Sequence, residues 1–315
     1  MTELILPIVF LLVALFILIR GSDLFIVGAK QMGSSLGMSK FAIGVLIVGF
    51  GTSLPELASS IAAALNGVTQ IVLANVVGSN ITNIFLVVGI LAAIGGPIAI
   101  KRDLIKTELP IFFIATALFL VVAFDGMVDK IEALLLLGVF GAYIWYLFGE
   151  AHREDDVDLT TQGRRQRLEF RSVVFIVLGI AAVLFGAKFT VDNVVEIAGL
   201  LSIPLGLISI AAIAIGTSLP ELFVSIQALK NGDTELAIGN IFGSNAFNIL
   251  VVIGIPGIIT PLIADEVVME LGLPIFLAAS VILFVSGLAR QIMRWEGVML
   301  LFFFAFFLIK LSEFI

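Results

Sequence analysis

The sequence predicts an all-α polytopic membrane protein with ten transmembrane helices, built as two inverted repeats of five helices each. Of its 315 residues, 60% are hydrophobic and only 13% are charged, whereas a soluble domain has roughly 25% charged residues. The apolar segments have the length of about 17–25 residues that a helix needs to cross ~30 Å of hydrocarbon. The heptapeptide Gly-Thr-Ser-Leu-Pro-Glu-Leu also occurs twice, at residues 51–57 and 216–222.

Charged or turn-rich breaks separate the apolar segments. The first segment has no basic residue before its apolar run, so we expect a transmembrane helix and not a removed signal peptide. We expect helices throughout, because the segments lack the alternating pattern of a β-barrel and each must satisfy its own backbone polar groups. The ten expected spans cover residues 4–28, 40–65, 70–97, 106–124, 128–148, 170–198, 204–229, 234–260, 267–289 and 295–314.

A fixed offset of 165 residues relates the two halves of the chain. It maps the first heptapeptide onto the second, and it maps "GSNITNI" (78–84) onto "GSNAFNI" (243–249). We therefore interpret residues 1–148 as a first five-helix repeat, 149–169 as a polar linker and 170–315 as a second repeat. Because five is an odd number, the second copy enters the membrane from the opposite face. Inverted repeats of this kind are typical of secondary transporters.

Basic residues predict the orientation in the membrane. Fourteen of the 17 lysines and arginines lie in or beside the loops of one side, which the positive-inside rule assigns to the cytoplasm. The 149–169 linker is therefore expected in the cytoplasm, and both termini are expected outside, in a multi-pass protein of the cell membrane.

Glu56 and Glu221 lie near the centres of the second and seventh spans. An acid at this depth costs on the order of 2.5–3.5 kcal/mol on insertion scales, so it normally has a partner or faces a cavity. Gly51 and Pro55 predict that helix 2 is broken, and the repeat predicts the same break in helix 7. The carbonyls around Gly49–Thr52 and Ala214–Thr217 are expected to lose their helical partners and to become available to a cation.

A local explanation of the motif is also open. Ser53, Pro55 and Glu56 fit a capping box, with serine at the N-cap, proline in the first turn and an acid three residues on. Such capping is compatible with ion binding. Alone, it does not explain why an acid recurs in the middle of a span in both halves.

The third and eighth spans add a stripe of polar residues. Asn75, Ser79 and Asn83 are spaced four residues apart, so they share one helical face. Their counterparts in the second half are Asn240, Ser244 and Asn248. Serine and asparagine commonly hold helices together in membranes, and we expect that role for Asn75 and its counterpart. For the other four residues we expect a role as cation ligands.

Together these residues form a set of oxygen donors from carboxylates, hydroxyls and amides, which suits hard cations such as Ca²⁺ or Na⁺. The chain has no cysteine and its only histidine, His152, lies in the linker, so thiolate and imidazole metal sites are excluded. Two carboxylates balance one Ca²⁺ or two Na⁺. The empty site would hold two like charges in a low dielectric, which favours exchange over one-way transport. The hydroxyl oxygens expected to bind the cation are those of Thr52, Thr217, Ser79 and Ser244.

At these residues the sequence resembles the sodium/calcium exchanger family of the calcium/cation antiporter superfamily, in its prokaryotic type without a large regulatory loop. The resemblance covers both signature motifs and essentially all ten spans. It implies a secondary antiporter that exchanges Ca²⁺ for Na⁺ by alternating access at a midplane site, as spans 1 and 6 slide past the other eight. The ion ligands it implies are Thr52, Ser53, Glu56, Ser79, Asn83, Thr217, Ser218, Glu221, Ser244 and Asn248, with backbone oxygens near Gly49 and Ala214.

One position departs from the family pattern, because many members have an aspartate where this chain has Asn248. The amide removes a third negative charge, puts K⁺ co-transport in doubt and leaves the Na⁺ stoichiometry open. A Ca²⁺/H⁺ antiporter is the nearest alternative, since buried glutamates also bind protons, and a passive cation channel is a further one.

The segment "GSSLG" (33–37) matches the nucleophile-elbow pattern of hydrolases. With the only histidine in the linker, we interpret this segment as a connection between spans 1 and 2 and expect no enzyme. No cofactor, no nucleic acid and no obligatory protein partner are expected. The expected partners are the lipid bilayer and the transported Ca²⁺ and Na⁺.

Overall fold

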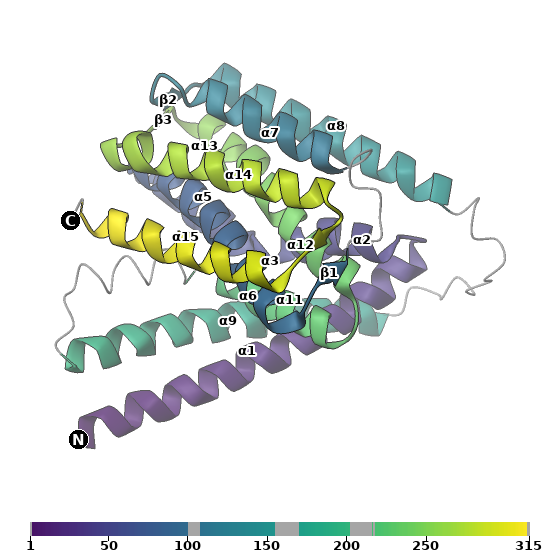
Figure 1. Cartoon of the computed structure of the whole chain (residues 1–315), viewed down its shortest axis with the longest axis vertical. Coiled ribbons are helices and arrows are strands. Elements are labelled where there is room, and N and C mark those ends of the chain that lie inside the picture. The colour runs from purple at the N-terminus through teal and green to yellow at the C-terminus, as the bar shows by residue number, and fades with distance from the viewer. Residues whose placement is uncertain (1, 100–107, 155–169, 202–215, 217, 314–315) are drawn as a thin grey trace.

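The structure is a computed structural model that describes residues 2–99, 108–154, 170–201, 216 and 218–313 (Figure 1). Helices make up nearly all of the regular structure in these residues. The expected all-α class is therefore confirmed.

The helices of the first half follow the expected spans. Helix α1 covers Thr2–Ser35, and the second span consists of several short pieces. The elements after α1 are α2 (Lys40–Ala42), η1 (Ile43–Gly49), α3 (Phe50–Thr52), α4 (Leu54–Leu65), α5 (Gln70–Thr82), η2 (Asn83–Val88), α6 (Gly89–Gly95), β1 (Ile98–Ala99), α7 (Glu108–Val122), β2 (Met127–Val128) and α8 (Lys130–Glu154).

The second half repeats this order from α9, which covers Phe170–Leu200. Most of the segment in which the first part of the seventh span is expected lies outside the described residues. The elements after it are α11 (Leu219–Lys230), α12 (Thr234–Phe247), η4 (Asn248–Val252), α13 (Gly254–Ile259), β3 (Leu262–Ile263), η5 (Val268–Gly272), α14 (Leu273–Leu288), β4 (Gln291–Ile292) and α15 (Arg294–Ser312).

Seven helices in the described part of the chain are long and apolar enough to cross a membrane. The bent pair Lys40–Thr52 and Leu54–Leu65 would be an eighth, and Leu109–Val122 is a shorter apolar helix. The predicted number of ten transmembrane helices therefore remains a prediction.

Burial differs strongly between these helices. In Thr234–Ile259 89% of the apolar window is buried, and in Gln70–Gly95 72%, but in α1 and α15 only 22% is buried. The two central helices carry the polar stripes of the sequence. Such mostly buried helices shield their polar groups from lipid, whereas α1 and α15 expose apolar side chains as a lipid-facing surface requires.

Two short antiparallel sheets join the halves of the chain. β1 pairs with β4 with Ile98 opposite Ile292, and β2 pairs with β3 with Met127 opposite Ile263. β3 precedes α14 and β4 follows it, so the sheets lie at opposite ends of this helix (Figure 1). Each sheet therefore fixes one end of the bundle across the two halves.

Helices α1 and α9 run antiparallel along one side of the molecule (Figure 1). Glycines let their backbones approach closely. A Cβ at Gly179 would lie 2.5 Å from the backbone nitrogen of Phe25, and a Cβ at Gly186 would lie 2.7 Å from that of Leu18. Small residues at such crossings are a typical device of membrane helix packing.

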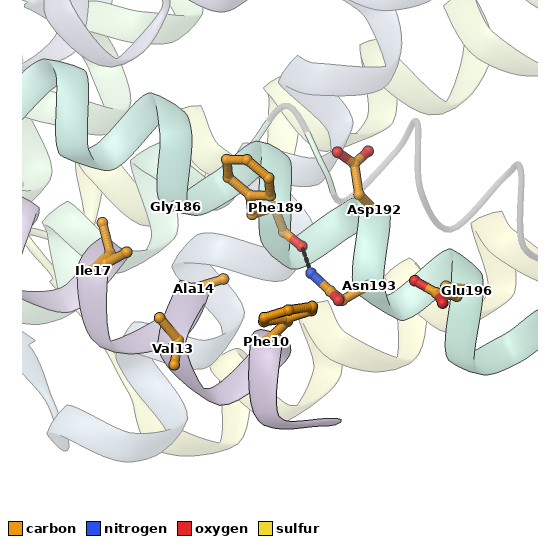
Figure 2. Close-up of a pocket in the computed structure, with 9 residues that line it drawn as sticks. All are labelled: Phe10, Val13, Ala14, Ile17, Gly186, Phe189, Asp192, Asn193 and Glu196. Carbon is orange, nitrogen blue, oxygen red and sulfur yellow. Dashed lines mark hydrogen bonds between the residues drawn. The ribbon is translucent and has the colours of Figure 1, made fainter. Parts of the chain in front are cut away.

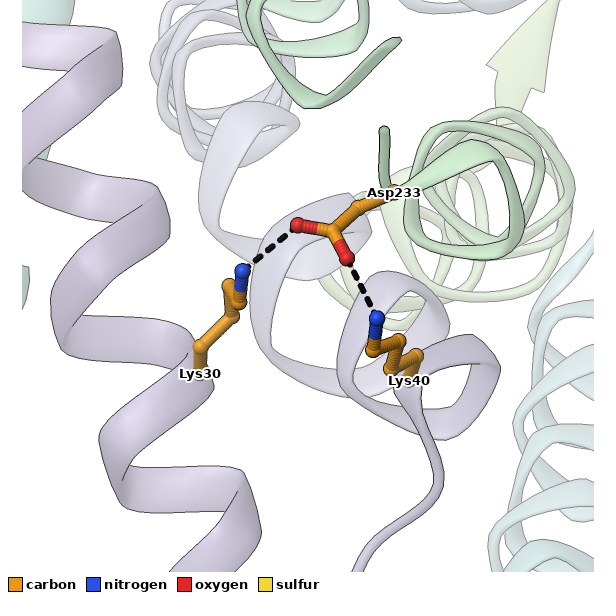
Figure 3. Close-up of polar contacts among 3 residues, drawn as sticks. All are labelled: Lys30, Lys40 and Asp233. Carbon is orange, nitrogen blue, oxygen red and sulfur yellow. Dashed lines mark hydrogen bonds and ion pairs between the residues drawn. The ribbon is translucent and has the colours of Figure 1, made fainter. Parts of the chain in front are cut away.

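An ion-pair cluster of three residues joins α1 to the second half (Figure 3). The carboxylate of Asp233, which is only 3% exposed, receives Lys30 Nζ at 2.5 Å and Lys40 Nζ at 2.7 Å. Burial raises the pKa of this carboxyl, but the hydrogen bonds and charges of the two lysines outweigh that effect and lower its pKa below the ordinary value. Asp233 lies in the turn between α11 and α12, so this contact links α1 and α2 to a turn 193 or more positions away in the sequence.

Candidate functional site

The second span breaks at the motif that carries its glutamate. α3 ends at Thr52 and α4 begins at Leu54, with a bend of 42° between the two parts of the span. Pro55 has no backbone N–H to continue the helix from the preceding turn. The bend places Glu56 in the first turn of α4, where its side chain is completely buried.

The second half starts its helix in the same way. Ser218 precedes α11 with φ −89° and ψ 2°, close to the φ −86° and ψ 8° of Ser53. Glu221 therefore lies in the first turn of α11, and it is also completely buried. Ser53 and Ser218 therefore share one backbone conformation at the start of their helices, whereas Thr217 and Ala214 lie outside the described residues.

Hydrogen bonds between the halves bring the two motifs together. The Ser53 hydroxyl donates to Glu221 Oε1 at 3.2 Å. The Thr52 hydroxyl donates to Asn240 Oδ1 at 3.2 Å and also lies 3.2 Å from the Gly49 carbonyl. Residues 168 and 188 positions apart in the chain thus meet at one buried site.

The polar stripes of the two central helices lie at the same site. Asn83 Nδ2 donates to Ser244 Oγ at 3.5 Å, and the Ser244 hydroxyl donates to the Asn240 carbonyl at 2.8 Å. The predicted ligands of both stripes are all at most 2% exposed, namely Ser79, Asn83, Ser244 and Asn248. The helices are wound as π-helix from Asn83 and from Asn248 onward. Single π turns often occur at functional sites.

Asn75 and Asn240 connect the central helices to the glutamate helices. Asn75 Nδ2 donates to Ser60 Oγ at 3.1 Å and lies 3.4 Å from the Glu56 carbonyl. Asn240 Nδ2 donates to Ser225 Oγ at 2.8 Å and to the Glu221 carbonyl at 3.3 Å. These contacts confirm the prediction that both asparagines hold helices together.

Several buried oxygens at this site have no hydrogen-bond partner among the described residues. They are Asn83 Oδ1, Asn248 Oδ1, Ser218 Oγ and Glu221 Oε2. A buried oxygen without a partner is unfavourable. In the described part of the chain no cluster of three or more acidic, histidine or cysteine side chains is present. The arrangement thus offers carboxylate, amide and hydroxyl oxygens, the donor set that hard cations prefer.

Comparisons with known proteins show the family to which this chain belongs. The family described as sodium/calcium exchanger protein matches residues 6–149 and 171–312. The chain belongs to the sodium/calcium exchanger family. It is similar to the sodium/calcium exchanger MaX1 of Methanosarcina acetivorans, with 36% identity over 96% of this chain and 97% of the relative. It is equally similar to the putative antiporter CaxA of Alkalimonas amylolytica, with 36% identity over 94% of this chain and 95% of the relative.

A solved structure agrees with this assignment. The sodium-calcium exchanger NCX_Mj, soaked with zero Na⁺ and Ca²⁺, matches with a TM-score of 0.80 and 30% identity, over 99% of this chain and 100% of that chain. This member of the exchanger family is therefore a multi-pass membrane protein of the transporter class.

For this exchanger the expected capping role of Ser53 is wrong, and the expected loss of helical partners around Gly49–Thr52 does not include the Gly49 carbonyl. The Ser53 side chain accepts no capping hydrogen bond from its own helix, and its hydroxyl donates to the carboxylate of Glu221. The Gly49 carbonyl does not lose its helical partner, since the backbone N–H of Ser53 still donates to it at 3.2 Å. The bend follows this hydrogen bond, so it is the carbonyl of Gly51, opposite the missing N–H of Pro55, that loses its helical donor.

The hydrolase-like segment 33–37 is the end of a helix in this exchanger. Ser35 is the last residue of α1, and its hydroxyl donates to the Met32 carbonyl at 2.7 Å. A nucleophile elbow would require a turn from a strand to a helix. The interpretation of this segment as a connection between two helices is confirmed.

Two asparagines of the site were missed as individual residues. Asn80 and Asn245 are completely buried and contact the predicted ligands Asn248 and Asn83. The 165-residue offset relates them to each other, so the repeat held a signal for their importance. The cluster of Lys30, Lys40 and Asp233 had no such signal, because its members are at least 193 positions apart across the halves.

A cavity of about 440 Å³ lies between α1 and α9 (Figure 2). Its walls are mainly apolar, with Asp192 and Glu196 of α9 at one end, and neither Glu56 nor Glu221 lines it. It is therefore separate from the candidate cation site. The lining residues are Phe10, Val13, Ala14, Ile17, Gly186, Phe189, Asp192, Asn193 and Glu196.

Proposed function

We propose that this exchanger moves Ca²⁺ against Na⁺ by alternating access at a buried site between its two halves. The observation that carries the proposal is the hydrogen bond from Ser53 in one signature motif to Glu221 in the other. It places both motifs at one site. MaX1 and NCX_Mj are named as sodium/calcium exchangers and match this chain over nearly its full length.

The charge of the site supports Ca²⁺ as one substrate. Glu56 and Glu221 supply two negative charges, and the other buried members of the proposed site, Ser53, Asn83 and Asn248, supply neutral oxygens. One Ca²⁺ or two Na⁺ would balance this charge. Without a cation, two carboxylates in a low dielectric would repel each other, so a conformational change of the empty site is disfavoured. Because the site changes conformation more readily with a bound cation than without one, the movement of one ion is coupled to the return of the other.

We propose that the predicted ligand set binds these ions. It comprises the residues of both motifs and both stripes, and it includes two residues outside the described part of the chain. The proposed ligands are Gly49, Thr52, Ser53, Glu56, Ser79, Asn83, Ala214, Thr217, Ser218, Glu221, Ser244 and Asn248.

Reciprocal contacts support the proposed inverted repeat. Adding 165 to Ile98 gives Ile263, and adding 165 to Met127 gives Ile292. The pair Ile98–Ile292 of one sheet is thus converted into the pair Met127–Ile263 of the other. A two-fold relation between the halves produces such exchanged pairs. Two inverted halves around one site can open it alternately to the two faces of the membrane.

The proposed moving part is the pair of helices α1 and α9. Their close glycine contacts hold them together, and only 22% and 28% of their apolar windows are buried, so much of their surface faces lipid. A pair that packs tightly within itself and faces lipid outside can slide as one body. We further propose that both termini lie outside and that the linker 149–169 is cytoplasmic.

Transport by the purified protein in sealed liposomes tests this function. We expect uptake of radioactive Ca²⁺ when Na⁺ is loaded inside and absent outside, with any pH gradient collapsed by an ionophore. Uptake driven only by a pH gradient would contradict Na⁺ coupling and favour the Ca²⁺/H⁺ alternative. Entry of Ca²⁺ at the same rate without any gradient of Na⁺ or protons would instead indicate a channel. The double variant Glu56→Gln and Glu221→Gln serves as the inactive control.

A further inference from the structure

Two reciprocal hydrogen bonds connect four asparagines across the two halves of the chain. Asn83 Nδ2 donates to Asn245 Oδ1 at 3.4 Å, and Asn248 Nδ2 donates to Asn80 Oδ1 at 3.3 Å. The 165-residue offset converts one contact into the other. All four side chains are at most 1% exposed, so water does not compete for these bonds.

The contacts leave the oxygen of each predicted ligand without a hydrogen bond. Asn83 Nδ2 also donates to Ser244 Oγ at 3.5 Å, so both of its N–H groups have acceptors in the opposite half. Asn83 Oδ1 and Asn248 Oδ1 have no partner among the described residues. In each ligand amide the nitrogen is held and the oxygen is the end that remains for a cation.

An asparagine amide fits the same space in two orientations, because rotation by about 180° exchanges oxygen and nitrogen with almost no change of shape. The neutral –NH₂ group has no lone pair to offer a cation, and its hydrogens would repel one. A rotated Asn248 would also turn its oxygen toward Asn80 Oδ1, which places two acceptors face to face. The amide acceptor in the opposite half therefore decides which end is presented.

We propose that Asn80 and Asn245 are positioning residues: each holds the amide nitrogen of a ligand in the opposite half, so that this ligand presents its oxygen to the transported cation. This inference rests on the proposed function. It assigns a role to two buried residues that are not themselves ligands. It also explains how a site with amides at both stripe positions binds a cation without a third carboxylate.

Asn80 is held more firmly than Asn245. Asn80 Nδ2 donates to the backbone carbonyl of Asn245 at 3.5 Å, and a backbone carbonyl cannot exchange its ends. Asn245 Nδ2 has no acceptor among the described residues. Asn80 is therefore the stronger positioning residue, and Asn248 is the ligand that depends on it.

The test uses Asn80→Leu, which keeps the size of the side chain and removes the acceptor. We expect the Ca²⁺ concentration for half-maximal transport to rise about tenfold, as the loss of one buried hydrogen bond predicts. Asn245→Leu is expected to have a smaller effect. Thr116→Val, another buried polar-to-apolar change at a hydroxyl without a partner among the described residues, is the control and should leave the value unchanged.

The decisive comparison repeats Asn80→Leu in the background of Asn248→Asp. A carboxylate has two equivalent oxygens, so its orientation no longer matters. In this background Asn80→Leu is expected to change the half-maximal Ca²⁺ concentration less than twofold. The proposal would be overturned if Asn80→Leu raised the half-maximal Ca²⁺ concentration by the same factor in both backgrounds, because the loss of a purely structural asparagine has the same effect in each. It would also be overturned if Asn80→Leu alone had no effect.

Ca²⁺ binding by the purified variants gives a second readout if Asn248→Asp does not transport. The rise of the unfolding temperature with Ca²⁺ measures binding directly, and the same pattern is expected in wild type and the three variants of the cycle. Wild-type protein that shows no Na⁺-driven Ca²⁺ transport would contradict the proposed function itself. Wild-type transport together with additive effects in the cycle would contradict only the positioning role.

Discussion

Single residues of this site combine two kinds of chemistry. Among the proposed ligands, the buried Glu56 and Glu221 carry the charge, whereas the buried Ser53, Asn83 and Asn248 have neutral oxygens. A buried carboxylate without a counterion is unfavourable in a low dielectric. The site is therefore expected to be more stable with its cation than without it, and this difference is measurable.

Glu56→Gln and Glu221→Gln should each lower Ca²⁺ transport at least 100-fold, because one negative charge no longer balances the divalent ion. The proteins should remain folded, since glutamine has the same shape and a buried neutral amide costs less than a buried charge. We expect the unfolding temperature without Ca²⁺ to be unchanged or higher, and its rise on addition of Ca²⁺ to disappear.

Uptake into liposomes and thermal unfolding with and without Ca²⁺ check this prediction. Glu270→Gln, an exposed change at η5, is the matched control and should behave as wild type. A single Glu→Gln variant that still transports Ca²⁺ at the wild-type rate would show that its carboxylate is not a ligand.

Helices deviate from regular geometry at the positions where the site needs it. The second span bends at Ser53, and the two central helices change to π winding at Asn83 and Asn248. The contact between α1 and α9, in contrast, is made by regular helices. Its glycines keep two regular helices close together over several turns.

Gly179→Ala should separate these two helices. The added Cβ would lie 2.5 Å from the backbone nitrogen of Phe25, and backbone atoms cannot rotate away as a side chain can. Overpacking of this kind costs about 1–3 kcal/mol. We expect a lower unfolding temperature and slower transport, measured on the purified protein in detergent and in liposomes.

Gly199→Ala on the same helix is the control, because a Cβ there would meet nothing within 4 Å. Its helix propensity favours alanine over glycine, so the unfolding temperature should be unchanged or slightly higher. If Gly179→Ala and Gly199→Ala lowered the unfolding temperature equally, the close contact between α1 and α9 would not be the reason for a glycine at position 179.

The sequence predicted the elements of this fold better than its contacts. Hydropathy located the helices, and the repeated motif predicted the bend that the structure places at Ser53. The hydrogen bond of the Ser53 side chain could not be predicted, because a serine in this motif can accept from a backbone N–H of its own helix or donate to a distant carboxylate. Only the packing of the two halves decides between them.

The same limit applies to the asparagines and to the ion-pair cluster. The repeat predicted ligand roles for Asn83 and Asn248, but the amide contacts of Asn80 depend on the distance between two helices that the sequence does not specify. The partners of Asp233 are likewise residues of the other half. Local patterns predict elements, whereas pairing across 160 residues or more requires the folded molecule.

In the whole molecule, several contacts among the described residues are exchanged between the two halves, and the ion-pair cluster is one that is not. The sheets and the asparagine pairs exchange under the 165-residue offset. The same offset relates Lys30, Lys40 and Asp233 to Val195, Leu205 and Val68, which carry no charge. The cluster therefore ties α1 to the turn between α11 and α12 at one face, and the related positions at the other face cannot form it.

Asp233→Asn should destabilise the whole protein at neutral pH. Hydrogen bonds to charged groups contribute about 1.5–3 kcal/mol, and the exposure of the two lysines reduces this contribution. We expect a loss of about 1 kcal/mol, seen as a lower unfolding temperature. Glu313→Gln is the control, since its pair with Lys310 is on the surface, with 56% of Glu313 exposed, and should contribute almost nothing.

The pH dependence of the same variant identifies the charge as the cause. The lysines lower the pKa of the folded Asp233 carboxyl, so its contribution is fully present above the unfolded value of about 3.9. It is lost as the pH falls through the lower, folded pKa. The difference in unfolding temperature between wild type and Asp233→Asn should therefore be constant from pH 6 to pH 8 and shrink in acid below about pH 4. A difference that persists in acid would show that Asp233 acts through its shape and packing and not through its charge.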